Sequence, residues 1–366
     1  MARKLKSDRV LFTTTVLLLC VSVVMVYSAS AVLAMDWFKQ PYFFLYRQAL
    51  WAAMGLAVLS IAMRIDYRTY RNNLFVWGLL GFVTLLLVAV FFSAPVNNAR
   101  RWLNVAGFGI QPSELAKIAA VLFTALMLER RMHRINEISY SLAPIGVVAG
   151  GLFGLIVLQP DYGTSISLLF VVSVMVFAAG LHYRYILAAG ALAAPALAWV
   201  LLSADYRIRR LTAFLNPEAD PLGAGFQIIQ SQIAVGTGGI TGRGLMGGVQ
   251  KLFYLPEPHT DFIFAVIGEE LGLIGTTVIV ICFCVIAWRG FRIAMNAEDS
   301  FGSFVALGLT TMIAFQALVN MSVVLGLMPT KGIPLPLVSN GGSSLLISLL
   351  AMGILLNISQ HESAAA

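Results

Sequence analysis

The sequence LPEPHTDFIF, residues 255–264, places ionisable side chains directly before a long apolar run. Glu257, His259 and Asp261 precede the run, and Glu269 and Glu270 follow about 12 to 14 Å further along it if it is helical. Ionisable residues are costly inside a bilayer, so each marks a candidate site. A carboxylate here can act as a general base or hold a cation, although aspartate is also a preferred helix N-cap. Histidine alone is weak evidence for a base.

A second candidate site lies in QPSELAK, residues 111–117, at the start of another apolar run. Glu114 and Lys117 are three residues apart, on one face of a helix, where they can form an ion pair. Glu114 also suits the positive end of a helix dipole. The pair is therefore either part of a site or a structural ion pair.

Two further segments carry charge between apolar runs. QPDYGTS, residues 159–165, places Asp161 where it can cap the next helix or take part in a site. NNARRWL places Arg100 and Arg101 beside a tryptophan. Arginines beside an interfacial aromatic are ordinary in membrane proteins, but two guanidinium groups also suit a lipid phosphate.

These residues must be positioned by membrane-spanning helices. Of the 366 residues 59% are hydrophobic and 11% charged, and the mean hydropathy is +0.86, which excludes an ordinary soluble domain. A bilayer core of about 30 Å requires about 20 apolar residues as helix. The sequence thus predicts a single all-α, polytopic membrane domain over residues 1–366 with ten transmembrane helices. They lie near residues 10–34, 46–63, 74–94, 112–129, 141–159, 162–181, 183–203, 262–288, 301–327 and 339–358.

Lysines and arginines favour alternate loops beginning with the N-terminus, which predicts that both termini are cytoplasmic. The net charge of +7 then reports orientation, and we expect no nucleic-acid partner. One long loop, about residues 204–260 between the seventh and eighth runs, is predicted to be extracytoplasmic. Its GRGLMG segment, residues 242–247, matches a dinucleotide-binding pattern but lacks the strand context, so we interpret the glycines as flexibility.

Seven motifs of this chain resemble, in the same order, those of the SEDS family (shape, elongation, division and sporulation). They are VMVYSASA, NNARRWL, QPSELAK, QPDYGTS, FLNPEADPLGAGFQIIQSQIAVGTGG, KLFYLPEPHTDFIFAVIGEELG and GLMPTKGIPLPLVSNGGSSLL. The resemblance spans nearly the whole chain. MPTKG and the closing ISQH resemble the division branch more than the elongation branch.

The resemblance implies a peptidoglycan glycosyltransferase, which polymerises lipid II at the outer face of the cytoplasmic membrane during septal wall synthesis. A sugar hydroxyl attacks a second sugar whose leaving group is undecaprenyl pyrophosphate. This chemistry requires a carboxylate base and positive charge on the pyrophosphate. The resemblance implies that Asp261 is the catalytic residue and makes it the candidate ligand of a divalent cation, Mg²⁺ or Mn²⁺. We expect no organic cofactor.

The resemblance also suggests supporting roles. Glu257 and His259 are candidates for groups near the base or the metal, and Glu269 and Glu270 for shaping a central cavity with Lys117. The candidates for binding substrate or pyrophosphate are Arg100, Arg101, Glu114, Lys117, Asp161, Arg243, Glu257, His259, Glu269, Glu270 and Ser343.

Other functions stay open at this point. The chain could be the elongation-type polymerase, or a lipid II flippase, for which we find no convincing inverted repeat. A scaffold alone would not require buried charges. The expected partners are lipid II, a class B penicillin-binding transpeptidase and other membrane proteins of the division machinery.

Overall fold

The computed structural model describes residues 7–95, 99–105, 108–202, 205–223 and 225–361. These residues form twelve α-helices and a short hairpin, with few other elements. The α-helices are α1 (Arg9–Phe38), α2 (Phe43–Ala62), α3 (Asn73–Val90), α4 (Pro112–Arg131), α5 (Ala143–Leu158), α6 (Tyr162–Ala178), α7 (Tyr183–Leu202), α8 (Asp205–Leu215), α9 (Phe226–Gly238), α10 (Ile263–Asn296), α11 (Ser300–Val324) and α12 (Gly342–Ser359). The shorter elements are the 3₁₀ turns η1 (Tyr67–Arg71), η2 (Met132–Arg134) and η4 (Pro217–Ala219), the π-helix η3 (Ile138–Leu142), and the antiparallel strands β1 (Leu103–Val105) and β2 (Phe108–Ile110).

Each predicted apolar run coincides with one helix, and the predicted long loop contains α8 and α9. Within the described residues, seven helices are long and apolar enough to cross a membrane: α1, α2, α3, α5 with the turn before it, α10, α11 and α12. The apolar α6 is shorter than a full span. The predicted all-α membrane fold is confirmed, with the small β1–β2 hairpin as an addition, and the number of ten spans stays a prediction.

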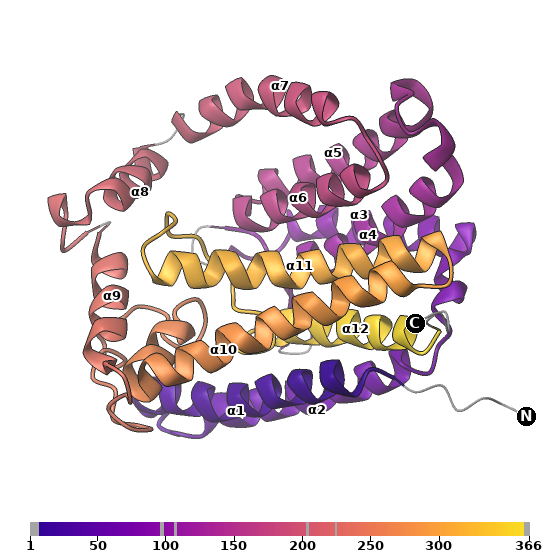
Figure 1. Ribbon diagram of the computed structural model, residues 1–366. Coiled ribbons are helices and arrows are strands. Elements are labelled where there is room, and N and C mark those ends of the chain that lie inside the picture. The colour runs from indigo at the N-terminus through magenta and orange to yellow at the C-terminus, as the bar shows by residue number, and fades with distance from the viewer. Residues whose placement is uncertain (1–6, 96–98, 106–107, 203–204, 224, 362–366) are drawn as a thin grey trace, which may run out of the picture.

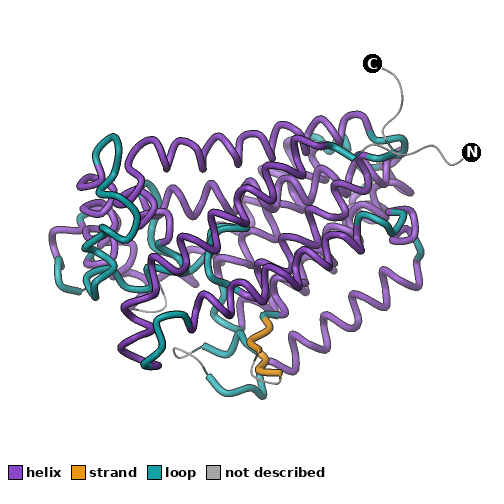
Figure 2. Tube along the Cα trace, turned by 90° about the horizontal axis from the view of Figure 1, so that it is seen from below, coloured by secondary structure: helices purple, strands orange, loops and turns teal. Residues whose placement is uncertain are grey.

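The long helices pack into one bundle with α4, α11 and α12 inside it (Figure 1). α12 packs against α2, α10 packs against α11, and α4 contacts α3, α6 and α11. α7 and α8 run along the edge of the bundle, away from α12 (Figure 1). The bundle helices lie roughly parallel or antiparallel (Figure 2). The amide of Asp8, before α1, donates to Ser359 Oγ at the end of α12 (3.0 Å), so the chain enters and leaves at the same end.

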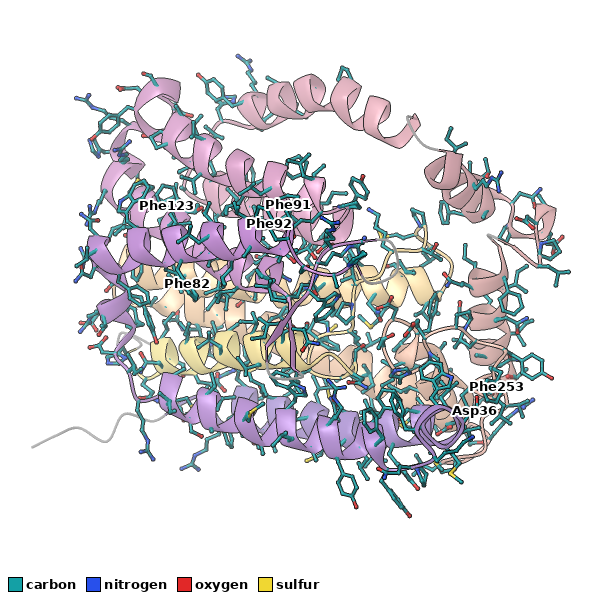
Figure 3. The ribbon with its side chains drawn as sticks, turned by 180° about the vertical axis from the view of Figure 1, so that it is seen from behind. Asp36, Phe82, Phe91, Phe92, Phe123 and Phe253 are labelled. Atoms are coloured by element: carbon teal, nitrogen blue, oxygen red, sulfur yellow. The ribbon has the colours of Figure 1, made fainter. Side chains whose placement is uncertain are left out.

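The exterior of the bundle is apolar, as a lipid-facing surface requires. Phe82 on α3 and Phe92 just beyond that helix are 54% and 86% exposed (Figure 3). Polar and charged side chains such as Lys117, Asp161 and Glu270 are instead buried between helices. The distribution is the reverse of that in a soluble protein, which supports the membrane assignment.

α10 is broken rather than continuous, because Gly272 takes a non-helical conformation with φ +65° and ψ −161°. The segment after α9 fills the break with main-chain hydrogen bonds. Its N–H groups donate to the carbonyls that end the first half of α10, and its carbonyls accept from the N–H groups that begin the second half. These bonds are Arg243 N to Glu269 O (3.0 Å), Gly244 N to Glu270 O (3.0 Å), Leu273 N to Gly239 O (2.9 Å) and Ile274 N to Ile240 O (3.2 Å).

The glycines of this segment are required for close approach. A Cβ on Gly242, whose φ is +79°, would overlap the carbonyl oxygen of Glu270, and a Cβ on Gly272 would overlap the amide of Gly242. The interpretation of GRGLMG as a flexible segment was therefore wrong. Gly242 and Gly272 let the main chain of the segment after α9 approach the main chain of α10. The hydrogen bonds between them satisfy the N–H and C=O groups that lost their helical partners at the break.

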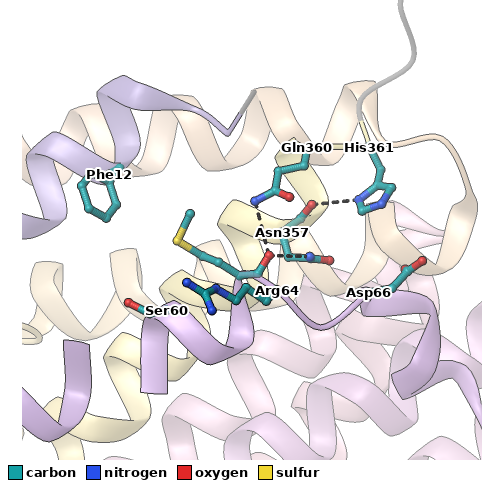
Figure 4. Close-up of a pocket in the computed structure, with 8 residues that line it drawn as sticks. Phe12, Ser60, Arg64, Asp66, Asn357, Gln360 and His361 are labelled. Atoms are coloured by element: carbon teal, nitrogen blue, oxygen red, sulfur yellow. Dashed lines mark hydrogen bonds between the residues drawn. The ribbon is translucent and has the colours of Figure 1, made fainter. Parts of the chain in front are cut away.

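The end of the bundle where α1 begins and α12 ends is held together by polar contacts. Asn357 Nδ2 and Gln360 Nε2 both donate to the carbonyl of Met63, at 2.9 and 3.3 Å, beside an open hollow of about 530 Å³ (Figure 4). Arg289 on α10 pairs with Asp8 (Nη2–Oδ2 2.5 Å). These contacts tie α1, α2, α10 and α12 together at the end where α1 begins.

Candidate active site

A polar cavity of about 250 Å³ lies at the end of the bundle where Asp261 precedes α10, which the sequence predicts to face the outside of the cell. It is formed by the segment before β1, by α9, by the end of the long loop and by the loop between α11 and α12. The lining residues are Ala99, Arg101, Trp102, Gln227, Glu257, Asp261, Phe262, Thr330, Lys331 and Gly332. Two carboxylates and two cationic side chains thus share one small cavity.

Main-chain contacts fix Asp261 in this cavity. Asn320 on α11 donates from Nδ2 both to the carbonyl of Asp261 and to that of Ile333, at 2.8 Å each. The carboxylate lies so close to Gly332 that a Cβ there would be 3.1 Å from Oδ2. The N-cap position of α10 is Phe262. Asp261 therefore lies one residue before the cap, and its carboxylate lines the cavity, which argues against the N-cap alternative.

The other two ionisable residues of this motif, Glu257 and His259, differ in their surroundings. Glu257 lines the cavity at a left-handed turn position (φ +51°), and its carboxylate accepts from Thr260 Oγ1 (3.1 Å). His259 is buried, and its ring lies 4.6 Å from the ring of Phe44 on α2. Burial lowers the pKa of His259, partly offset by the nearby charge of Glu257. Among the described residues its Nδ1 has no hydrogen-bond partner, so the ring packs between elements rather than beside the base.

Arg101 and Lys331 supply the positive charge of the cavity. The Arg101 guanidinium donates to the carbonyls of Gln159 and Pro160, which holds it against the turn before α6. Arg100 instead donates to the carbonyl of Phe91 (2.5 Å) and is exposed. Lys331, in the MPTKG motif, was missed as a candidate site residue. It is half-buried, and burial lowers the pKa of its ammonium group.

Polar residues at the start of α4 form hydrogen bonds with the turn before α6, the same turn that Arg101 contacts. The carboxylate of Asp161 accepts from Gln111 Nε2 (2.9 Å) and Ser113 Oγ (3.0 Å), and it caps α6 by accepting from the amide of Thr164 (3.3 Å). Capping is therefore part of its role. The main-chain amide of Gln111 donates to Ser343 Oγ (3.3 Å), and this bond connects the same network to α12.

Lys117 is buried with Glu114 as its partner, as predicted. The distance from Lys117 Nζ to Glu114 Oε1 is 3.0 Å, and Ser344 Oγ lies 3.5 Å from the other carboxylate oxygen. The pair lies one turn into α4, inside the bundle. The contact of Glu114 with Ser344 connects α4 to α12, about one turn after Gln111.

Glu269 and Glu270 have different partners from those expected. Glu269 accepts from the amides of Val249 (2.7 Å) and Gln250 (3.1 Å), and Arg243 Nη1 lies 3.5 Å away. Glu270 pairs with Lys251 (Nζ–Oε1 2.5 Å) and accepts from Ser28 Oγ on α1 (2.5 Å).

Both carboxylates therefore anchor the long loop. Neither one's described contacts reach Lys117, so the expected grouping of the two glutamates with that lysine was wrong. Arg243 belongs to this anchor as well, since its guanidinium lies beside Glu269. Lys251 was missed by sequence reasoning.

The cavity offers two carboxylates that could bind a divalent cation. Among the described residues no three His, Cys, Asp or Glu side chains cluster as a metal site. Mg²⁺ is commonly bound by one or two carboxylates together with substrate phosphates, and Asp261 with Glu257 offers that donor set. The residues thus fit a cation that arrives with its substrate better than a permanently bound metal.

Comparison with known proteins places the chain in a family. A family model described as cell cycle protein, covering FtsW, RodA and SpoVE, matches residues 8–364. The chain belongs to this family. It is 46% identical over 360 residues to a probable peptidoglycan glycosyltransferase FtsW of Geobacter sp. (strain M18), covering 98% of each chain. It is 44% identical over 361 residues to stage V sporulation protein E of Bacillus subtilis (strain 168), covering 98% of this chain and 99% of that protein.

Solved structures of the family share the fold. A chain from a peptidoglycan synthase complex that coordinates polymerisation and crosslinking matches with a TM-score of 0.80 and 32% identity, over 99% of this chain and 100% of that one. Rod shape determining protein RodA of Thermus thermophilus matches with a TM-score of 0.73 and 27% identity, over 99% of each chain. The chain is thus a multi-pass membrane protein of this family.

Proposed function

We propose that the chain is a peptidoglycan glycosyltransferase that polymerises lipid II into glycan strands at the outer face of the cytoplasmic membrane. The observation that carries the proposal is the outer cavity, which brings Asp261 and Glu257 together with Arg101 and Lys331. Relatives named as peptidoglycan glycosyltransferases share 46% of their residues with the chain over nearly its full length, which supports the same activity here.

The cavity residues can divide the reaction between them. The Asp261 carboxylate accepts the proton of the acceptor sugar hydroxyl as that oxygen attacks the anomeric carbon of the second sugar. A new glycosidic bond forms while the bond from the anomeric carbon to the pyrophosphate oxygen breaks, and the leaving group keeps that electron pair. Arg101 and Lys331 offset the negative charge that develops on the pyrophosphate.

A divalent cation, Mg²⁺ or Mn²⁺, would be held by Asp261 and Glu257. When bound it supplies further positive charge to the pyrophosphate. The chain's own contribution is the position of the two carboxylates. Asn320 holds the main chain at Asp261, and the turn at Glu257 directs that carboxylate into the same cavity.

The division role is the version of this function that the comparisons favour. Relatives named FtsW are 39 to 47% identical to the chain, whereas the solved RodA is 27% identical. We therefore propose a role in septal wall synthesis, with the elongation-type polymerase as the alternative. A class B penicillin-binding transpeptidase is the proposed partner, since a matched structure belongs to a complex that both polymerises and crosslinks.

The partner is proposed to bind along the outer half of α10 and α11 and the long loop. Val280 on α10 is exposed, whereas its neighbour Ile279 is buried in the bundle. A photocrosslinker at Val280 should therefore capture the transmembrane helix of the transpeptidase, and one at Ile279 serves as the buried control.

Labelled lipid II tests the function directly. We expect the purified protein with its transpeptidase, in Mg²⁺ or Mn²⁺, to produce ladders of glycan strands. Transbilayer movement of lipid II in liposomes without ladders would support the flippase alternative instead. Absence of both activities from well-folded protein with its partner would contradict the proposal.

A further inference from the structure

In the segment Gly239–Tyr254 of the long loop, a charged side chain is buried and several large apolar side chains are exposed. Lys251 is 3% exposed, whereas Ile240 is 68% and Phe253 60% exposed. Leu245 and Met246 are also exposed. In a water-exposed loop the lysine would be outside and the large apolar residues inside. This arrangement is the one expected of a surface that faces lipid.

The exposed apolar side chains continue the outer surface of α10. The carbonyl of Ile240 accepts from the amide of Ile274, so these two residues are adjacent. Ile274 is 57% exposed, and Leu273 beside it is exposed as well. The segment therefore extends a helix surface that already belongs to a candidate membrane span.

The depth of the break in α10 can be worked out from the two helices that flank it. Gly272 lies about 26 Å along α10 from Arg289, which pairs with Asp8 at the cytoplasmic end, at about 1.5 Å per residue. This is less than the bilayer core of about 30 Å.

α1 gives the same depth independently. It packs beside α10, and Ser28 contacts both Glu270 and Lys251. From Ser28 the helix continues for about 12 Å before it reaches Asp36. Asp36 and Phe253 lie at the same end of the molecule (Figure 3). Both helices therefore place Lys251 and the break within the outer part of the hydrocarbon region.

Irregular backbone at this depth is permitted only where its polar groups are satisfied within the protein. The reciprocal bonds with the break satisfy the N–H groups of Arg243 and Gly244 and the carbonyls of Gly239 and Ile240. Glu269 accepts from the main-chain amides of Val249 and Gln250, whereas Gln250 Oε1 is buried with no hydrogen-bond partner among the described residues. Arg243 and Lys251 are the charged residues of the segment. Lys251 is neutralised by Glu270. Arg243 contacts the buried Glu269, and its partly exposed side chain is long enough to reach the interface between membrane and water.

We infer that Gly239–Tyr254 is a re-entrant membrane segment whose apolar side chains contact the acyl chains of the outer leaflet. The polar cavity follows directly in the chain, since Glu257 and Asp261 come next. The lipid-facing segment thus sets the depth of these carboxylates below the outer surface. The inference depends on the placement of the segment and not on which reaction the cavity performs.

Spin-label accessibility in nanodiscs tests this placement. Cysteine is introduced singly at Ile240 or Leu245 in a background in which Cys20, Cys282 and Cys284 are alanine, and each variant is labelled with a nitroxide. Ile281, exposed on α10, provides the lipid reference, and Ala219, exposed in the turn after α8, provides the water reference. All proteins are measured first without a partner and then with the transpeptidase added.

Labels at Ile240 and Leu245 should relax faster with oxygen than with a water-soluble nickel chelate, as at Ile281, and opposite to Ala219. Preference for the chelate at either position, in a variant that folds, would overturn the inference. So would labels that are open to water alone and become shielded only when the transpeptidase is added, since the surface would then belong to the partner. Because two separate positions are measured, one that fails to fold does not leave the inference untested.

Discussion

The buried ion pair between Lys251 and Glu270 has a calculable effect on stability. Lys251 Nζ lies 2.5 Å from Glu270 Oε1, with 3% and 0% of the two side chains exposed. Lys251→Met leaves a buried carboxylate with the Ser28 hydroxyl and the Met246 amide as its described donors. Removing one partner of a buried pair costs about 3–5 kcal/mol. The free energy of unfolding of Lys251→Met should therefore lie about 3–5 kcal/mol below that of the parent.

Two further variants separate the charge effect from the loss of a side chain. Lys251→Met with Glu270→Gln removes both charges, so most of the lost stability should return. Arg134→Met breaks the exposed pair with Glu137, whose atoms lie 3.8 Å apart with 56% and 55% exposure, and should cost less than about 1 kcal/mol. Unfolding is followed by tryptophan fluorescence in mixed micelles. If Lys251→Met is no less stable than Arg134→Met, the buried pair does not anchor the loop.

Three other predictions test the interior pair, the cavity and the topology. Because Lys117 neutralises the buried carboxylate of Glu114, Lys117→Met leaves that charge unpaired inside the bundle and should reduce glycan synthesis strongly, and a fully active variant would make the pair purely structural. Burial lowers the pKa of Lys331, so its ammonium group loses its proton at a lower pH than free lysine does. Arginine stays charged, so Lys331→Arg should move the alkaline fall of the pH–rate profile to higher pH, and an unmoved profile would assign that fall to another group. A cysteine at Ala219 should react with an impermeant maleimide in intact spheroplasts, and reaction only after lysis would reverse the topology.

The fold could be predicted because a bilayer imposes strict requirements on sequence. A membrane-spanning helix needs a long apolar run, and each such run is one of the helices observed. The hairpin β1–β2 escaped prediction because two three-residue strands leave little periodic pattern. The break at Gly272 also escaped, since the segment that fills it comes from about 30 residues earlier in the chain.

The site was predicted where a motif and its position agreed. Asp261 and Glu257 were predicted as site residues, and the structure places both in one cavity. Lysine in a loop usually faces water, so neither Lys251 nor Lys331 stood out in the sequence. Local spacing identified the Lys117 pair correctly. The partners of Glu269 lie about 20 residues away in an irregular segment, where spacing gives no information.

Glycan synthesis by Asp261→Asn is the most direct test of the central claim. Asparagine keeps the size of the side chain and removes its charge, and Asp36→Asn, an exposed position at the outer end of α1, makes the same change away from the cavity. At equal membrane levels and with the transpeptidase bound, Asp261→Asn should lose about 10²- to 10⁴-fold in the rate of polymerisation, while Asp36→Asn keeps the parental rate. A rate for Asp261→Asn within about threefold of the parent would contradict general-base catalysis by this carboxylate.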